Sequence, residues 1–219
     1  MEEANLAYRL IVVDDGSTDG TAAVLTECQS RFPLTVLRHD TNLGLGSAIR
    51  DGLLLAAKES GDNDVVVTMD ADETHTPGLT LRMVAAIREG HDVVIASRYQ
   101  RGSRTVGVPL IRRFLSGSAS LLFRCVFPTP GVRDFTCGYR AYRGGALKLA
   151  IASYGDRFVE ADGFQCMVDL LLKLRKLNLV MGEVPLILRY DLKEGQTKMR
   201  LAKTAFQTIA LLTRRRLGL

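Results

Sequence analysis

The sequence predicts an α/β protein built on a mostly parallel β-sheet flanked by helices. Short β-branched runs alternate with helical stretches over residues 1–97, as in a series of βα units. Gly61 and Gly90 stand just beyond two of the helical stretches as stop signals. The chain has 219 residues, 47% of them apolar, and no linker or internal repeat, so we expect one domain over residues 1–219 with a sizeable core.

Each predicted element follows from its pattern of apolar residues. Four β-branched runs in the first half are the predicted strands: Leu10–Val13, Thr35–Arg38, Val65–Met69 and Val93–Ala96. The stretches between them have the spacing of helices: Thr21–Arg31, Ser47–Ser60 and Leu79–Glu89. The second half is predicted to be α+β, with a strand at Val184–Leu188 and helices at Leu110–Val126, Gly163–Leu177 and Met199–Arg214.

Charge is divided between the two halves of the chain. Residues 1–97 carry 7 basic and 16 acidic side chains, whereas residues 98–219 carry 22 and 8. Nine arginines and a single acid, Asp134, lie between Arg98 and Arg143, a composition that suits phosphates, anionic lipid headgroups or nucleic acid. A solvated basic face is the alternative interpretation. Few aromatic residues interleave with these arginines, so no nucleic-acid partner is expected.

The sequence indicates a cytoplasmic location. Its uncharged apolar runs are shorter than the ~20 residues that cross a bilayer, and it does not open with the pattern of a secretory signal. The four cysteines show no C-x-x-C spacing, which favours reduced thiols over a zinc site or a disulfide framework.

Acidic residues follow two of the predicted strands. Asp14-Asp15-Gly16 continues the first run and Asp70-Ala71-Asp72 the third, and open parallel sheets bind ligands beyond the carboxyl ends of their strands. Two carboxylates one residue apart repel each other unless a cation or hydrogen-bond donors neutralise them, so a divalent metal is a natural occupant. The structural alternatives are a simple βα turn for Asp14-Asp15-Gly16 and a helix cap for Asp70-Ala71-Asp72.

Two other segments match known ligand-binding loops only in part. Residues 15–20 resemble the start of an EF-hand loop, but the twelfth position holds Thr26 instead of a bidentate glutamate. Asn42-Leu43-Gly44-Leu45-Gly46 is rich in glycine but lacks the lysine of a phosphate loop.

Together these segments resemble the family 2 glycosyltransferases of GT-A fold, a nucleotide-diphospho-sugar transferase fold, and most closely the dolichyl-phosphate or polyprenyl-phosphate mannose synthases. The resemblance covers nearly the whole chain. It rests on Val12–Thr21, Asn42–Gly46, Met69–Asp72 with His75 and Pro77, Ala96–Tyr99, Arg112 with Ser116, Asp134–Arg140, Gly182–Pro185 and Gly195–Lys198.

The resemblance assigns roles to individual residues. The nucleotide-binding residues it implies are Asp14, Asp15, Asn42, Gly44, Asp70 and Ala71, with Asp15 at the base. Asp70 and Asp72 are the implied ligands of Mg²⁺ or Mn²⁺ bridging the diphosphate, a metal that would stabilise the leaving group. The residues implied around the phosphates of donor and acceptor are Arg98, Arg112, Ser116, Arg140 and Lys198.

Asp72, Arg98 and Asp169 are the catalytic candidates. Asp169 lies 14 residues before Glu183, the offset of an acid in the family, but the familiar Phe-Gln-x-Glu reads Cys166-Met167-Val168-Asp169 here. An acid on a helix surface is the equal alternative for Asp169.

By this resemblance, residues 1–97 bind nucleotide and metal, residues 98–197 bind the acceptor, and residues 198–219 form a basic amphipathic helix. The implied reaction is a metal-dependent, inverting transfer of a sugar such as mannose or glucose from a nucleotide-diphosphate sugar to a polyprenyl or dolichyl phosphate. The alternatives are a hydroxyl acceptor, which would need a base, and an inactive or regulatory module or membrane-surface binding domain. A peripheral contact with the cytoplasmic membrane face is expected from the terminal helix, with core packing as its alternative.

Family members open with a strand ending in Pro-x-Tyr-Asn-Glu and a helix, ahead of the Val-Val-Asp-Asp strand. The present sequence begins inside that helix, with Met1–Ala7 as its last turns. We therefore expect a sheet from which the first strand is absent, leaving an unpaired edge or an apolar groove.

Overall fold

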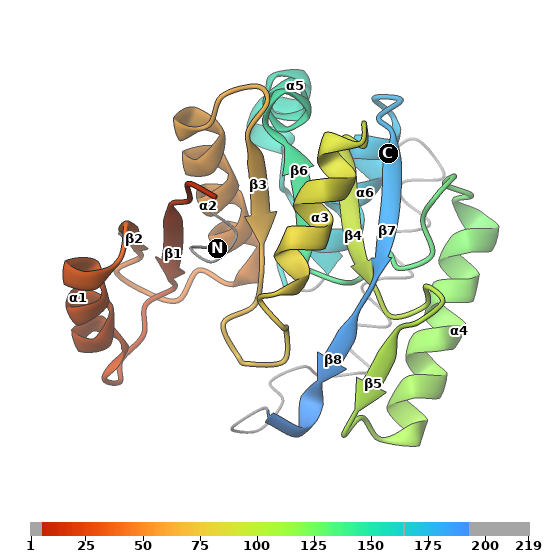
Figure 1. Cartoon of the computed structure of the whole chain (residues 1–219), viewed down its shortest axis with the longest axis horizontal. Helices are drawn as coiled ribbons and strands as arrows, with labels where there is room; N and C mark the ends of the chain where they lie inside the picture. The colour runs from red at the N-terminus through yellow and green to blue at the C-terminus, as the bar shows by residue number, and fades with distance from the viewer. Residues whose placement is uncertain (1–5, 164, 193–219) are drawn as a thin grey trace.

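A computed structural model describes residues 6–163 and 165–192 (Figure 1). The strands are β1 (Leu10–Asp14), β2 (Leu34–Arg38), β3 (Val65–Thr68), β4 (Val93–Ser97), β5 (Arg104–Val106), β6 (Arg140–Arg143), β7 (Met181–Pro185) and β8 (Ile187–Arg189). The helices are α1 (Thr21–Arg31), α2 (Leu45–Glu59), α3 (Leu79–Arg88), α4 (Leu110–Val126), α5 (Gly144–Tyr154) and α6 (Gln165–Arg175), with short 3₁₀ turns at Gly155–Arg157 and Tyr190–Leu192.

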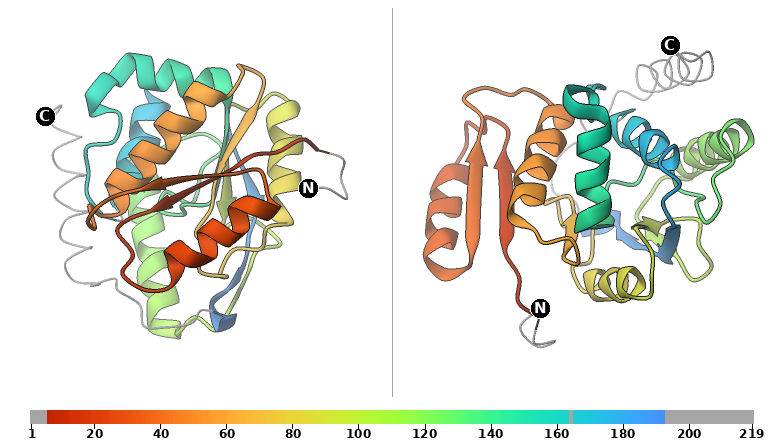
Figure 2. Two further views of the ribbon diagram at one scale, coloured as in Figure 1. Left: turned by 90° about the vertical axis from the view of Figure 1, so that its left-hand side faces the viewer. Right: turned by 90° about the horizontal axis from the view of Figure 1, so that it is seen from above.

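The strands form a central sheet and two smaller ones. The central sheet has the order β3-β6-β4-β7, in which β6 is antiparallel to both neighbours and β4 is parallel to β7. Strands β1 and β2 form a parallel pair, as do β5 and β8. Helix α3 covers one face of the central sheet, and α2, α5 and α6 lie on the other (Figures 1 and 2).

The core lies between these layers. Strand β4 is buried along its whole length because β6 and β7 flank it and helices cover both faces. Its valines and isoleucine pack in one cluster with the apolar side of α3 and with the leucines of α6. This is the pattern expected of a central strand, whose continuous apolar run has no polar face.

Most of the predicted elements are confirmed. Helices Thr21–Arg31 and Leu110–Val126 have the predicted bounds, and the four predicted strands of the first half are present with ends shifted by one residue or less. The predicted helix Met199–Arg214, like the whole segment 198–219, lies outside the described residues.

The single strand predicted over Val184–Leu188 is wrong, because the segment contains parts of two strands. Pro185 ends β7, and the chain then leaves β4 to pair with β5. Buried Leu186 makes the change of partner: its amide donates to the Ser97 carbonyl at 2.9 Å and its carbonyl accepts from the Arg104 amide at 2.9 Å.

The sheet is mixed rather than mostly parallel because of β6, which the sequence did not predict. Its four residues, Arg140–Arg143, carry two arginines and precede the glycines that open α5. Arg140, Ala141 and Tyr142 are buried nevertheless, since β6 inserts between β3 and β4. Tertiary packing overrides the weak local signal here.

The sheet is interrupted between β1 and β3. In the described part of the chain, β1 pairs only with β2 and β3 only with β6. Leu10 remains 42% exposed, and Val65, Val66 and Val67 are only half-buried. Within the described residues, β1 and β3 thus each have one unpaired edge.

We predict that adding a β-strand and helix of the family type ahead of Met1 raises the melting temperature and strengthens nucleotide binding. The added strand would cover the apolar side chains of β1 and β3, with a gain of roughly 25 cal/mol per Å² of apolar surface buried. Thermal unfolding and nucleotide titration of the two forms would test this. Equal melting temperatures and affinities would contradict it.

Candidate active site

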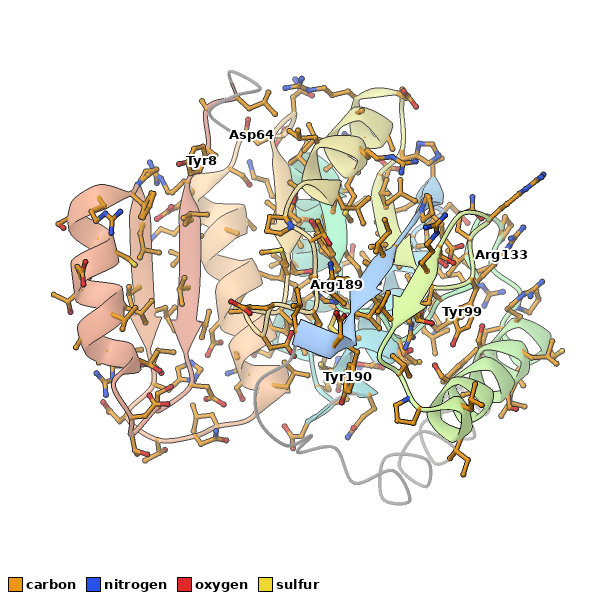
Figure 3. All side chains as sticks on the ribbon, turned by 60° about the horizontal axis from the view of Figure 1, so that its bottom comes forward. Tyr8, Asp64, Tyr99, Arg133, Arg189 and Tyr190 are labelled. Atoms are coloured by element: carbon orange, nitrogen blue, oxygen red, sulfur yellow. The ribbon has the colours of Figure 1, made fainter. Side chains whose placement is uncertain are left out.

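The candidate site lies at the carboxyl ends of the central strands, at the lower edge of Figure 1, where the loop after β3 emerges. Figure 3 brings this edge forward, with Arg189 and Tyr190 at the end of β8 and Tyr99 beside α4. The predicted site residues fall into three groups there. One group surrounds Asp15, one is the loop from Asp70, and one surrounds Arg98.

The loop after β3 presents the predicted metal ligands. Asp70 is exposed and Asp72 is half-buried. The Thr74 hydroxyl and amide donate to Asp72 Oδ1 at 2.6 and 3.2 Å, and the Asp70 amide donates to His75 Nδ1 at 3.2 Å. Buried His75 stacks on the Tyr139 ring at 5.0 Å between centroids. The loop is therefore braced by buried Thr74 and His75, while Asp70 remains exposed and Asp72 half-buried.

The residues of this loop fit a metal that is shared with a ligand. Within residues 6–163 and 165–192, no group of three or more His, Cys, Asp or Glu side chains could hold a metal ion. A divalent cation at Asp70 and Asp72 would therefore take its other ligands from elsewhere. Mg²⁺ and similar ions are commonly bound in this way, by one or two carboxylates together with substrate phosphates and water.

The second group is organised by Asp15. Its Oδ1 accepts from the Leu43 amide at 2.8 Å and contacts His39 Nδ1 at 2.7 Å, and its Oδ2 accepts from the Gly44 amide at 2.8 Å. Burial alone would raise the pKa of Asp15, but these hydrogen bonds outweigh it and hold the pKa below its usual value. Asp15 thus fixes the turn that contains Asn42 and Gly44, as the sequence analysis grouped them.

Asp14 has a different environment from Asp15. It is 4% exposed, its Oδ1 accepts from the Ser17 amide at 2.9 Å, and its Oδ2 lies 3.5 Å from the Arg38 guanidinium. These contacts stabilise the turn after β1 and leave Asp14 little surface for a nucleotide.

The third group is an ion pair between Arg98 and Asp134. Arg98 donates through Nε and Nη2 to the two carboxylate oxygens at 2.8 Å each, and Nη2 also donates to the Thr136 hydroxyl at 2.5 Å. Asp134 is fully buried. Burial would raise the pKa of Asp134, but Arg98 outweighs it and the pKa is lowered. Nearby, the hydroxyls of Tyr99 and Ser116 are 2.7 Å apart, which brings Ser116 of α4 to this group.

Two predicted site residues are buried within the protein. Arg140 is fully buried and donates to the carbonyls of Phe135, Cys137 and Met167 at 2.8–2.9 Å, so it offers no surface to a phosphate in this conformation. Asp169 is also fully buried and forms an ion pair with Lys173 at 2.8 Å. The alternative of a helix-surface acid for Asp169 is therefore wrong.

Two further residues cannot be placed in detail. Arg112 lies in α4, but its side chain is outside the described part of the structure, and Lys198 lies outside the described residues. Ala71 is exposed between Asp70 and Asp72.

The sequence analysis missed His39 and Asp51. His39 follows the carboxyl end of β2, so the rule that singled out the acids after β1 and β3 would also have found it. Asp51 lies inside α2 and carries no comparable signal.

Comparison with known proteins identifies the family. Residues 2–149, well over half of the chain, match the family described as Glycosyl transferase family 2. The chain belongs to this family. It is 30% identical over 205 residues to a dolichol-phosphate mannosyltransferase of Pyrococcus furiosus, covering 92% of this chain and 53% of the relative. It is 33% identical over 179 residues to a polyprenol monophosphomannose synthase of Mycolicibacterium smegmatis, covering 81% and 65%. The chain thus spans less than two thirds of either relative.

A solved structure of another protein shares the fold of the chain. A glucosyl-3-phosphoglycerate synthase from Mycobacterium tuberculosis, in complex with Mn²⁺, uridine diphosphate and glucosyl-3-phosphoglycerate, superposes with a TM-score of 0.65. The match covers 98% of this chain and 70% of that protein at 23% identity. The predicted GT-A fold class of this family 2 chain is thereby confirmed.

We predict that Asp134→Asn lowers the free energy of unfolding by about 3–5 kcal/mol, because it leaves the Arg98 guanidinium partly buried without its counter-ion. Chemical denaturation would measure the change. Asp62→Asn, which removes the exposed pair between Asp62 and Lys148, is the matched control and should change stability little. Equal losses in the two variants would contradict the prediction.

Proposed function

We propose that this family 2 chain transfers a sugar from a nucleotide-diphosphate sugar to a polyprenyl or dolichyl phosphate, in a reaction that depends on Mg²⁺ or Mn²⁺. The observation that carries the proposal is the loop Asp70-Ala71-Asp72 at the carboxyl end of β3, which His75 and Thr74 brace and in which Asp70 is exposed and Asp72 half-buried. The two mannosyltransferase relatives support the sugar-phosphate chemistry.

In the proposed mechanism, the chain's own residues hold the donor. Asp70 and Asp72 would bind the metal, which would supply positive charge to the departing diphosphate. Asp15 and the turn that contains Asn42 and Gly44 would border the nucleoside. Arg98, oriented by Asp134, would place a guanidinium near the phosphates without the need to reorganise during the reaction.

The burial of Asp169 favours a phosphate acceptor over a hydroxyl acceptor. A hydroxyl must lose its proton, so it needs a general base within reach. Asp169, the candidate base, is fully buried and ion-paired with Lys173. A lipid phosphate is already anionic at neutral pH, and its oxygen can attack the anomeric carbon with inversion and without a base.

We also propose that the chain meets its lipid acceptor at the membrane surface. None of the described helices is long and apolar enough to cross a bilayer. Among the described side chains of α4, four large apolar ones are exposed: Leu110, Ile111, Leu121 and Leu122. The same helix contains arginines. Such a helix can lie in the interface with its cations on anionic headgroups.

We predict that Asp72→Asn abolishes metal-dependent nucleotide binding and lowers transfer at least about a hundredfold, because the diphosphate charge loses its compensation. Titration with GDP and UDP, with and without Mn²⁺, and a transfer assay would measure both effects. Asp156→Asn, at an exposed aspartate in the turn after α5, is the control and should behave as wild type. Full activity of Asp72→Asn, or of wild type in excess EDTA, would refute the metal assignment.

We further predict salt-sensitive binding to anionic liposomes. Each cation near an anionic surface contributes about 1 kcal/mol, so replacing Arg214, Arg215 and Arg216 by Gln should lower co-sedimentation. Equal binding of the wild type to neutral and anionic vesicles at every salt concentration would contradict the membrane proposal.

A further inference from the structure

His39 lies between two carboxylates at the carboxyl end of β2. Its Nδ1 is 2.7 Å from Asp15 Oδ1 and its Nε2 is 3.1 Å from Asp51 Oδ2, and the residue is 8% exposed. A neutral imidazole carries one N–H and one lone pair, so it can donate to only one of these carboxylates. The imidazolium donates to both, which makes it the form that satisfies this geometry.

Protonation of His39 brings the charges around the ring closer to balance, with Asp162 as a further carboxylate that acts on Arg50. From α2, Arg50 faces the same group and donates through Nε to Asp51 Oδ1 at 2.8 Å. Asp15 and Asp51 then carry two negative charges against the two positive charges of Arg50 and His39. The neighbouring Asp14 is paired separately, with Arg38 of β2. The Asp15 hydrogen bond, opposed by burial, raises the pKa of His39 above 6.5, with Asp51 adding to the effect.

The ring is joined to the turn that borders the predicted nucleotide site. The His39 amide donates to the Asp14 carbonyl at 2.9 Å, which fixes the histidine next to Asp15. Asp15 in turn holds the amides of Leu43 and Gly44. The turn also packs closely against Gly16, where a Cβ would lie 2.5–2.6 Å from backbone atoms of Thr41 and Asn42.

We propose that protonated His39 is a positioning residue, which orients the Asp15 carboxylate and thereby sets the 42–44 turn for a nucleoside. This inference rests on the proposed function, in which that turn borders the donor.

Three consequences follow from the charge of the ring. Nucleotide affinity should decline as His39 loses its proton. His39 should contribute fully to stability below about pH 6.5 and lose this contribution as the pH rises through its raised folded-state pKa. Removing Asp51 should make His39 lose its proton at lower pH.

The test combines ring-nitrogen NMR with nucleotide titration on the full chain. The chain has three histidines, so the signal of His39 can be assigned from His39→Gln. GDP and UDP affinities with Mn²⁺ would be measured between about pH 6 and pH 9. In wild type, we expect the affinity to fall over the pH range in which His39 titrates. In Asp51→Asn, which keeps both His39 and Asp15, the NMR titration and the fall in affinity should move together to lower pH.

His39→Gln should bind nucleotide about tenfold more weakly at the acidic end and lack the pH-dependent fall, because a charge-assisted hydrogen bond is lost. His91→Gln is the control, because His91 Nδ1 contacts the Ala86 carbonyl at the end of α3. This variant should keep the wild-type dependence of nucleotide affinity on pH.

An ordinary His39 pKa, or the same dependence of affinity on pH in wild type and Asp51→Asn, would overturn the inference. Absence of metal-dependent nucleotide binding at every pH, with the NMR titration as expected, would instead overturn the proposed function.

Discussion

Neutralisation of carboxylates is the electrostatic constraint on which this structure depends. Ends of strands and starts of helices bring acidic side chains into a small volume, and an unpaired buried carboxylate is costly. Asp134 is neutralised by Arg98 and Asp169 by Lys173. Asp15 is neutralised by two backbone amides and His39. The pairings of Asp134 and Asp15 also join segments that are distant in the sequence, so charge compensation and site geometry have the same origin there.

The loop that contains Asp70 and Asp72 differs from these pairs. It is braced by His75 and Thr74, yet Asp70 is exposed and Asp72 only half-buried, whereas Asp134 and Asp169 are fully buried. Two accessible acidic residues on a braced loop are suited to a cation that arrives with its own ligands. For this reason the proposed chemistry is centred on the loop after β3, and the buried ion pairs stabilise the segments around that loop.

Much of the fold could be predicted from the sequence because its signals are local. The β-branched runs at Leu10–Val13 and Val93–Ala96 are strands, and the apolar spacing of Leu110–Val126 is a helix. Strand β6 could not be predicted, since its place between β3 and β4 depends on contacts distant in sequence. The same holds for the change of partner at Leu186, which only the register of two strands defines.

The roles assigned to the candidate site residues stay predictions, but part of their arrangement can be compared with the structure. The family resemblance grouped Asp15 with Asn42 and Gly44, and Asp15 accepts hydrogen bonds from the Leu43 and Gly44 amides. Spacing carries no information about burial, however. It could not distinguish Arg98, which is oriented by Asp134 near the surface, from Arg140, whose donors are all directed to buried carbonyls. The sequence analysis also passed over His39, although its place directly after β2 is a signal that the strand-end rule would have detected.

The central claim is that Asp70 and Asp72 bind a metal together with a diphosphate. The most direct measurement is Mn²⁺ binding followed by electron paramagnetic resonance, with and without GDP or UDP. Two carboxylates alone should bind Mn²⁺ weakly, and a nucleoside diphosphate should strengthen this binding by completing the coordination. Mn²⁺ affinity that is the same with and without either nucleotide would contradict the account.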